Sequence, residues 1–458
     1  MSRYTSATDA DRAAMLEAIG VASIDELFAD IPADLRLGRA LELPDGKPET
    51  EVYDRLAALA AQNAHVEREV SFLGAGMYDH YVPAIVDSIC QRSEFLTPYT
   101  PYQPEISQGT LQTMFEYQTA ICELTGMPVS NASLYEGPSS VAAAGYLAKL
   151  ETGRRRFVVS RGVHPHSRET LETYSAGYGT EVAEVPLQAG ATDAAALASA
   201  VDEETAAVIL QYPNYLGAVE DLAALEPVAK SSGALLVVSV DAPTLGVLKP
   251  PGELGADVVV GEGQPLGNRL DFGGPSFGFF AAREEYLRRM PGRIAGQTVD
   301  VDGRRGFVLT LQTREQHIRR EKATSNICTS QALNALAGAI YLSWLGRQGI
   351  VELGTLMAQR TAYARDRLVA LDGVELLHEQ PVVREFALRL GAPVEAVLRR
   401  CAERGVNAGH PLGPDYPEHP DGLLVAITER TSPADIDLLA DVLGAAVAAE
   451  RRPEAVSA

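Results

Sequence analysis

The sequence has few cysteines and no uncharged stretch that is apolar throughout. Its four cysteines are far apart and form no Cys-x-x-Cys pair, which argues against a disulfide framework and a zinc site: Cys90, Cys122, Cys328 and Cys401. The first residues lack the apolar core of a signal peptide, and the longest uncharged stretch, 323–346, contains Ser, Thr, Asn and Gln. We therefore expect a cytoplasmic protein without a membrane span.

Positive charge is scarce as well. The chain has 39 Lys and Arg against 61 Asp and Glu, a formal net charge of -22. Such a balance argues against nucleic acid and anionic membranes as partners, because both require a basic face. The pair His164 and His166 has no further ligand at metal-binding spacing, so no metal is expected either.

The 458 residues are enough for more than one domain. The pattern predicts an N-terminal helical arm over residues 1–60 and a large three-layer α/β/α domain over 61–325, where apolar strands alternate with helices. It then predicts C-terminal helices with a small α+β domain over 326–450, and a tail over 451–458.

The chain has only five lysines: Lys47, Lys149, Lys230, Lys249 and Lys322. A predicted strand ends on Asp241, in the manner of enzymes that use pyridoxal phosphate (PLP) and protonate its pyridine nitrogen with a carboxylate. The next predicted strand leads into 261–267, where such enzymes carry the lysine that binds PLP covalently. This segment has Gln264 instead, which cannot form that bond.

Several segments together carry a resemblance to one family. They are 72–78 (FLGAGMY), 92–109 (RSEFLTPYTPYQPEISQG), 115–128 (FEYQT to LTGMP) and 311–328 (LQTREQHIRREKATSNIC). The sequence resembles the glycine-cleavage-system P-protein, glycine dehydrogenase (decarboxylating), over nearly its whole length. The segment 135–141 (YEGPSSV) departs from the acidic-Gly-Ala-Thr-Ala type of sequence that is more usual in this family.

The resemblance implies a PLP-dependent transferase of fold type I, the aminotransferase-like fold. It implies an enzyme that decarboxylates glycine on PLP and transfers the aminomethyl group to the lipoyl arm of the H-protein. Because this chain lacks the lysine, it is similar to subunit 1 of the family's two-subunit form. PLP is then expected on the lysine-bearing subunit 2, in an assembly of two copies of each subunit.

The resemblance and the residue types together suggest which side chains take part. A proline-fixed loop rich in hydroxyls and amides is expected to complete the partner's active site: Tyr99, Tyr102, Gln103, Ser107 and Gln108. A second group could bind an anion as the next helix begins, or only cap that helix: Arg320, Ser325 and Asn326. Asp241 and Asn214 are expected to be vestiges of a cofactor site.

Two other functions stay open from the sequence. The chain could be a stand-alone PLP enzyme that uses an unexpected lysine such as Lys322. It could also be a noncatalytic regulatory or scaffolding paralogue. The first alternative predicts a visible absorption that sodium borohydride abolishes, and the second predicts no gain in activity on adding the lysine-bearing subunit.

Overall fold

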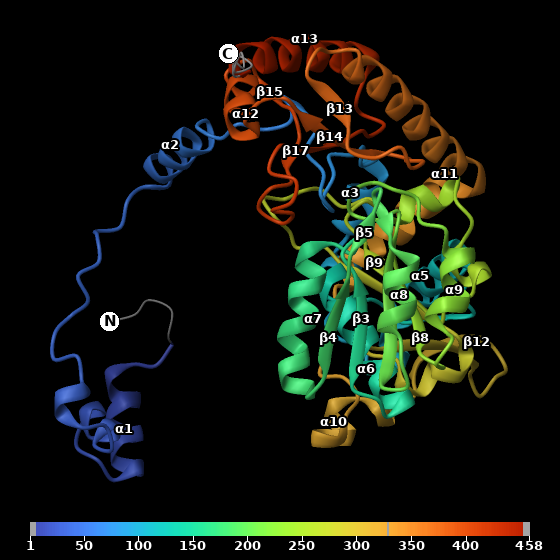
Figure 1. The fold of residues 1–458 in the computed structure, drawn as a ribbon. Helices are drawn as coiled ribbons and strands as arrows, with labels where there is room; N and C mark the ends of the chain where they lie inside the picture. The colour runs from blue at the N-terminus through green and yellow to red at the C-terminus, as the bar shows by residue number, and fades with distance from the viewer. Residues whose placement is uncertain (1–5, 328, 452–458) are drawn as a thin grey trace. The chain divides into compact units, whose positions relative to one another are not determined.

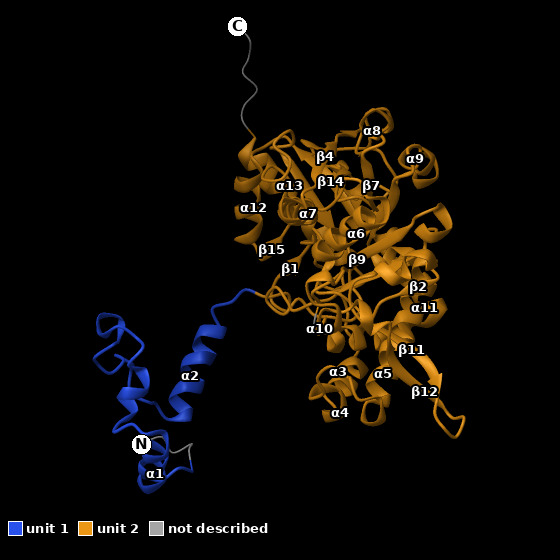
Figure 2. Ribbon diagram, turned by 90° about the horizontal axis from the view of Figure 1, so that it is seen from below, with its two compact units in different colours: residues 1–64 blue, residues 65–458 orange. Residues whose placement is uncertain are grey.

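The structure is a computed structural model and describes residues 6–327 and 329–451. Figures 1 and 2 show two compact units, Met1–Ala64 and His65–Ala458. The first unit contains the helices α1 (Asp9–Ile19) and α2 (Glu49–Ala60), and none of its described residues, 6–64, is buried. Except for Arg451, the predicted tail lies outside the described residues. The domain boundaries drawn from the sequence stay a prediction.

The second unit is built on a seven-stranded sheet in the order β2-β10-β9-β8-β7-β3-β4. The five strands from β9 to β4 are parallel, whereas β10 runs antiparallel to β9 and β2. Their bounds are β2 Val129–Ser130, β3 Arg156–Ser160, β4 Glu181–Val185, β7 Thr205–Tyr212, β8 Leu235–Val240, β9 Val258–Glu262 and β10 Gly278–Ala282.

Helices cover both faces of this sheet (Figure 1). Neighbouring residues of β8 belong to different cores: Val238 packs with residues of α5, α9 and α11, and Val237 packs with residues of α6 and α7. This is why the strands are apolar throughout rather than alternating. The helices are α5 Gln108–Thr125, α6 Gly137–Thr152, α7 Pro165–Tyr178, α8 Ala194–Ala200, α9 Leu222–Ala229 and α11 Ala332–Val369. The three-layer α/β/α domain expected from the sequence is confirmed.

A smaller α+β domain follows, as the sequence predicts. Its antiparallel sheet has the order β13-β14-β17-β16 and packs with α12, α13 and the second half of α11 in a separate core. The helix α11 is broken at Gly346, where φ is 61°. The bounds are β13 Val374–Leu376, β14 Glu385–Leu390, β16 His410–Pro411, β17 Gly422–Ala426, α12 Val394–Ala402 and α13 Pro433–Glu450.

Short elements complete the second unit. β1 (Val70–Ser71) pairs with β15 (Val406–Asn407), β5 (Leu187–Gln188) with β6 (Ala191–Thr192), and β11 (Ile294–Val299) forms a hairpin with β12 (Arg305–Thr310). Short helices include α3 Ala84–Cys90, α4 Ser93–Leu96, η3 Pro104–Ile106, η4 Ala242–Gly246, η6 Glu284–Arg289, α10 Gln316–Arg319 and η8 Arg320–Lys322. Within the described ranges, every helix is too short or too polar to cross a bilayer.

Candidate functional site

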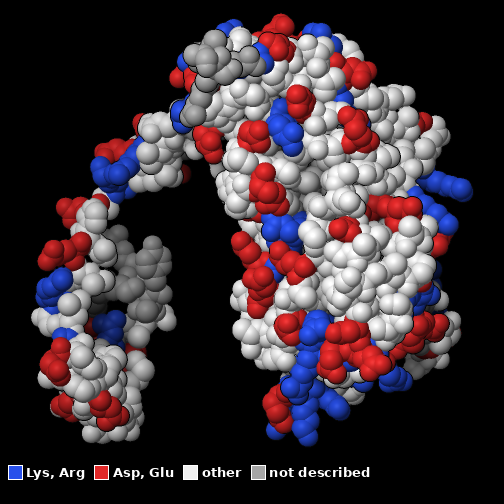
Figure 3. All heavy atoms as spheres, in the orientation of Figure 1, with Lys and Arg blue, Asp and Glu red and all other residues white. Residues whose placement is uncertain are grey.

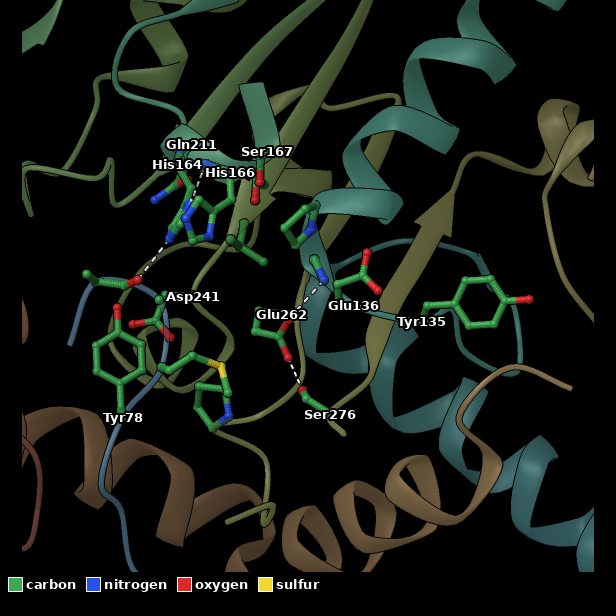
Figure 4. Close-up of a pocket in the computed structure, with 18 of the residues that line it drawn as sticks. Tyr78, Tyr135, Glu136, His164, His166, Ser167, Gln211, Asp241, Glu262 and Ser276 are labelled. Carbon is green, nitrogen blue, oxygen red and sulfur yellow. Dashed lines mark hydrogen bonds between the residues drawn. The ribbon is translucent and has the colours of Figure 1, made fainter. Parts of the chain in front are cut away.

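A cavity of about 500 Å³ lies where β7, β8 and β9 end. Ligands of parallel α/β sheets bind at this edge, because the loops after neighbouring strands converge there. In Figure 4 its labelled side chains come from these strand ends, from the starts of α6 and α7, and from the segments before α3 and β10. We call it the strand-end cavity; its charged and polar lining includes Tyr78, Glu136, His164, His166, Gln211, Asp241, Glu262 and Ser276.

Gln264 stands beside this cavity and is completely buried. Its Oε1 accepts a hydrogen bond from the backbone N–H of Tyr78 at 2.9 Å, and its Nε2 donates to the carbonyls of Tyr78 at 3.0 Å and Asn268 at 2.9 Å. The amide therefore clamps the segment around Tyr78 to the loop after β9. A side chain with all its hydrogen bonds made to backbone serves structure rather than chemistry.

Asp241 lies at the end of β8 and is paired within the chain. Its Oδ1 accepts a hydrogen bond from Nη2 of Arg384 at 2.5 Å. The Arg384 guanidinium lies 3.4 Å from the ring centroid of Tyr78 and is 3% exposed. Burial raises the pKa of Asp241, and Arg384 opposes that rise. The carboxylate that would hold a pyridine nitrogen thus already holds a guanidinium.

The residue after Arg384 extends this network. The Tyr78 hydroxyl donates to Glu385 Oε2 at 2.5 Å, and the Ala75 N–H donates to Glu385 Oε1 at 2.7 Å. Burial raises the pKa of Glu385 to about 7 and raises that of the Tyr78 hydroxyl strongly. Together the network joins the small domain to the edge of the large sheet.

The start of α6 is where a phosphate group would find free backbone N–H donors. Here Glu262 occupies that position: its Oε2 accepts the N–H of Gly137 at 2.9 Å, and its Oε1 accepts the Ser276 hydroxyl. Glu136, the N-cap, accepts the N–H of Ser139 at 3.0 Å. Burial raises the pKa of Glu262. Two carboxylates at this helix start repel a phosphate.

His164 also lines this cavity, and both of its ring nitrogens are hydrogen-bonded to backbone groups. Its Nε2 lies 2.8 Å from the Ala75 carbonyl, and its Nδ1 accepts the N–H of His166 at 3.1 Å. The ring therefore carries its proton on Nε2. Burial lowers the pKa of His164 to about 4, so it is neutral at physiological pH. Among the described residues no cluster of His, Cys, Asp and Glu could hold a metal.

These contacts test whether the cavity fits PLP. The lysine position is a buried glutamine, Asp241 is bound to Arg384, and the helix start that would hold a phosphate carries Glu262. Each of the three groups that PLP needs is absent or already occupied. The strand-end cavity of this chain does not fit the cofactor.

The predicted loop 99–108 lies away from the strand-end cavity, and none of its residues lines that cavity. Tyr99 is 72% exposed and Tyr102 is 42% exposed, and Gln103 is exposed beside them. Gln108 holds the loop to the hairpin: its Oε1 accepts the Phe307 N–H at 2.9 Å, and its Nε2 donates to the Phe307 carbonyl at 2.9 Å. Ser107 precedes α5 as its N-cap residue without a side-chain capping bond.

A buried arginine that sequence reasoning missed joins the two predicted segments. Nη2 of Arg293 donates to the Tyr102 hydroxyl at 2.6 Å, and its Nε lies 3.6 Å from Glu315 Oε2. Tyr102 also meets the ring of His317 edge-on, with centroids 5.2 Å apart. Arg293 is 2% exposed and Glu315 is 6% exposed. The structure therefore brings loop 99–108 next to the segment that begins at Glu315.

The second predicted group follows α10. Arg320 is exposed and has a φ of 54°. Ser325 Oγ accepts a hydrogen bond from the backbone N–H of Ile327 at 3.2 Å. The backbone carbonyl of Asn326 accepts a hydrogen bond from Nε2 of Gln316 at 3.2 Å. Ser325 and Asn326 line a groove with Tyr135, and Lys322 lines a cavity beside that groove rather than the strand-end cavity.

Asn214 is not among the residues that line the strand-end cavity. Its Nδ2 donates to the Gly190 carbonyl and to Glu220 at 2.8 Å each, and its Oδ1 accepts the N–H of Leu216 and of Ala218. The side chain holds the turn after β7, which leaves it no donor for a ring.

The comparisons with known proteins agree with each other. The family model "Glycine cleavage system P-protein" matches residues 2–443. Relatives named "Probable glycine dehydrogenase (decarboxylating) subunit 1" are 49% identical in Geobacillus thermodenitrificans, covering 97% of this chain and 99% of the relative, and 50% identical in Bacillus licheniformis, covering 96% and 98%.

The solved structures give the same result. A crystal structure of glycine decarboxylase (P-protein) of the glycine cleavage system, in inhibitor-bound form, is 44% identical with a TM-score of 0.89, covering 97% of this chain and 100% of that chain. A glutamate decarboxylase of Lactobacillus brevis, at 13% identity and a TM-score of 0.68, shares the fold, which is fold type I of PLP-dependent enzymes. The chain belongs to the glycine cleavage system P-protein family.

Proposed function

We propose that this chain is the lysine-free half of a heteromeric glycine decarboxylase. Its partner, the lysine-bearing subunit 2, holds PLP covalently and decarboxylates glycine there. The aminomethyl group then passes to the lipoyl arm of the H-protein. The observation that carries the proposal is the strand-end cavity, which in a member of this family has Gln264 at the lysine position and Glu262 where a phosphate would bind.

The role of this chain is then to shape and wall the partner's active site. Tyr99 and Tyr102 stand exposed on a proline-fixed loop, and Arg293 and Gln108 hold that loop from behind. Ser325, Asn326 and Arg320 lie on the neighbouring segment. Rigid hydroxyl and amide groups on such a surface can orient a bound substrate and exclude water when a second subunit covers them.

We further propose an assembly of two copies of each subunit, since homologous halves favour closed symmetric pairing. We assign it to the cytoplasm, because the three described cysteines are free thiols: Cys90, Cys122 and Cys401.

The experiment is glycine–bicarbonate carbon exchange with PLP and lipoylated H-protein. It compares this chain alone, the lysine-bearing subunit alone, and their mixture. We expect exchange only in the mixture. Exchange by this chain alone would overturn the argument from Gln264, and exchange by the partner alone that does not change on mixing would make this chain a noncatalytic paralogue.

A second measurement tests where PLP is held. We expect the isolated chain, incubated with PLP and freed of the excess, to show no visible band, and to carry no covalent adduct after subsequent borohydride treatment. The isolated partner serves as the positive control. A borohydride-trapped adduct on Lys322 would instead support a stand-alone PLP enzyme.

A further inference from the structure

The strand-end cavity does not fit PLP, yet its volume of about 500 Å³ is typical of pockets that bind small molecules. Its lining carries charge of one sign. Three carboxylates line it, Glu136, Asp241 and Glu262, and none of the described residues in the lining is a lysine or an arginine. Arg384 pairs with Asp241 from outside the lining. The other two carboxylates therefore determine which sign of charge the cavity accepts.

These two carboxylates have hydrogen bonds but no counter-cation. Glu262 accepts hydrogen bonds from neutral donors only, which are the N–H groups of Gly137 and Gln264 at 2.9 Å each and the Ser276 hydroxyl. Within the described ranges, no ion pair involves Glu262 or Glu136, and Glu136 Oε2 has no hydrogen bond. A carboxylate offers about four lone-pair positions, so both can still accept a donor from a bound molecule.

Two serine hydroxyls in the lining also have no partner. Ser167, in the first turn of α7, is 3% exposed, and its hydroxyl points into the cavity in Figure 4. Ser239 on β8 is 9% exposed and lies beside Gln211 of β7. Among the described residues no hydrogen bond reaches either hydroxyl. Buried hydroxyls are nearly always hydrogen-bonded in folded proteins, so this pair indicates a place for a bound polar group.

The two kinds of polar group lie on different sides of the cavity. In Figure 4, Ser167 and Gln211 lie on one side, and Glu136 and Glu262 lie on another. Gln211 Oε1 accepts the backbone N–H of His164 at 2.8 Å, which leaves its Nε2 as a donor toward the cavity. Apolar side chains form much of the remaining wall: Met77, Pro138, Val240, Pro265 and Pro275.

The charge of the whole chain favours the same sign of ligand. The formal net charge is -22. Figure 3 shows acidic atoms spread over the visible face of the second unit, whereas basic atoms gather most densely at its lower edge. A chain with this balance attracts cations and repels anions.

We propose that the strand-end cavity binds a small organic cation, an alkylammonium compound with a hydroxyl at its other end. Glu262 and Glu136 hold the ammonium group, and Ser167 and Gln211 hold the hydroxyl. A carboxylate or phosphate ligand would be repelled at the start of α6. A diamine would find no unpaired carboxylate for its second ammonium, because Asp241 is already paired. Charge-assisted hydrogen bonds are the stronger ones, so the ammonium end supplies most of the affinity.

The probe is dimethylaminopentanol, which carries its amine and its hydroxyl at opposite ends of a pentyl chain. It is titrated calorimetrically into the full-length chain and into the heteromer, since a tertiary amine cannot form an imine with PLP. We expect saturable binding to both. The neutral alcohol in which a CH group replaces the protonated nitrogen should bind at least about tenfold more weakly. Equal binding of this neutral alcohol would overturn the proposal.

Glu262→Gln tests the ammonium end. We expect the Kd of dimethylaminopentanol to rise by about tenfold or more, because the variant removes the charge from the cavity. The matched control is Glu220→Gln. Glu220 is also buried and hydrogen-bonded to neutral donors, those of Thr192 and Asn214, but it does not line this cavity. An equal rise of Kd in both variants would show a general charge effect and would contradict the site.

Ser167→Ala tests the hydroxyl end. The Kd of dimethylaminopentanol should rise about threefold, while that of dimethylpentylamine, which has no hydroxyl, should not change. The matched control is Ser175→Ala on the same helix, whose hydroxyl is also buried without a partner in the described structure but lies outside this cavity. Equal weakening of both amines by Ser167→Ala would overturn the assigned orientation.

Two further outcomes would overturn the inference. One is the absence of saturable binding up to about 10 mM dimethylaminopentanol. The other is binding to the isolated chain that disappears in the heteromer, which would show that the second subunit fills the cavity. Binding is measured without glycine exchange, so this inference and the proposed function can fail separately.

Discussion

At the residue scale, the polar groups of the strand-end cavity at the positions that PLP would use are already bound within the chain. Gln264, Arg384 and Glu262 each make contacts that PLP would otherwise make or require. These three side chains are charged or polar, and nearly all of their polar atoms are hydrogen-bonded. Their burial therefore costs little stability. A lysine at position 264 alone should therefore not create a PLP site.

We expect Gln264→Lys to bind no PLP covalently. Asp241 would still be held by Arg384, and Glu262 would still repel the phosphate. The measurement is visible absorption after the excess PLP has been removed, followed by borohydride trapping. Gln264→Met, which loses the amide clamp without gaining an amine, controls for unfolding. A band that appears in the lysine variant alone would show that one residue separates the two kinds of subunit.

A second expectation concerns Tyr102, whose hydroxyl accepts a hydrogen bond from the buried guanidinium of Arg293. Tyr102→Phe should lower kcat/KM for glycine of the heteromer by about tenfold, the size expected for one hydrogen bond to a charged group. The melting temperature should also fall, because the buried Arg293 guanidinium loses a hydrogen-bond partner. Tyr81→Phe, on a ring that is also exposed, should be silent. An unchanged kcat/KM for glycine in Tyr102→Phe would show that this side chain serves only in packing.

Only part of this site could be predicted from the sequence. Asp241 and Gln264 could be placed, because each follows an apolar strand and strand ends share one edge of a sheet. Arg384 and Arg293 could not, because they lie 143 and 191 residues from the side chains they bind, Asp241 and Tyr102. Without a repeat or a motif that links the two segments, residue spacing in the sequence does not predict which distant side chains bind each other.

At the element scale, the strand and helix pattern was enough for the layers of the fold. Continuous apolar runs predicted strands covered on both faces, and the two cores on either side of β8 bear this out. The pattern did not predict how closely two helices or strands approach each other. The break in α11 at Gly346 and the packing of η4 on α11 depend on contacts between distant segments.

Gly246 tests that close approach. A Cβ at this position of η4 would lie 2.1 Å from the carbonyl oxygen of Ile350 in α11, which is backbone and cannot move aside. We expect Gly246→Ala to lose about 2 kcal/mol or more of stability, measured by denaturant unfolding. Gly177→Ala in α7, where a Cβ meets nothing within 4 Å, should be neutral or gain up to about 1 kcal/mol. Equal behaviour of the two variants would contradict this account.

At the scale of the whole molecule, one buried network connects the parts of the second unit. Glu385 and Arg384 belong to the small domain, Asp241 to the large sheet, and Tyr78 to the segment before α3. The network therefore holds the small domain against the end of β8.

The protonation of Glu385 should make that connection depend on pH. Its pKa is about 7 in the folded chain and 4.5 as the ordinary value, so the folded state keeps a proton that the unfolded state has released between these values. The stabilisation is complete below about pH 4.5 and is lost as the pH rises through about 7. Glu385→Gln stays neutral, so from pH 5 to 8 the wild type should lose melting temperature relative to this variant. His164, with its pKa lowered to about 4, changes stability in the opposite direction, but both proteins contain it and its effect cancels. A difference that stays constant across the range would mean that Glu385 is already ionised at pH 5.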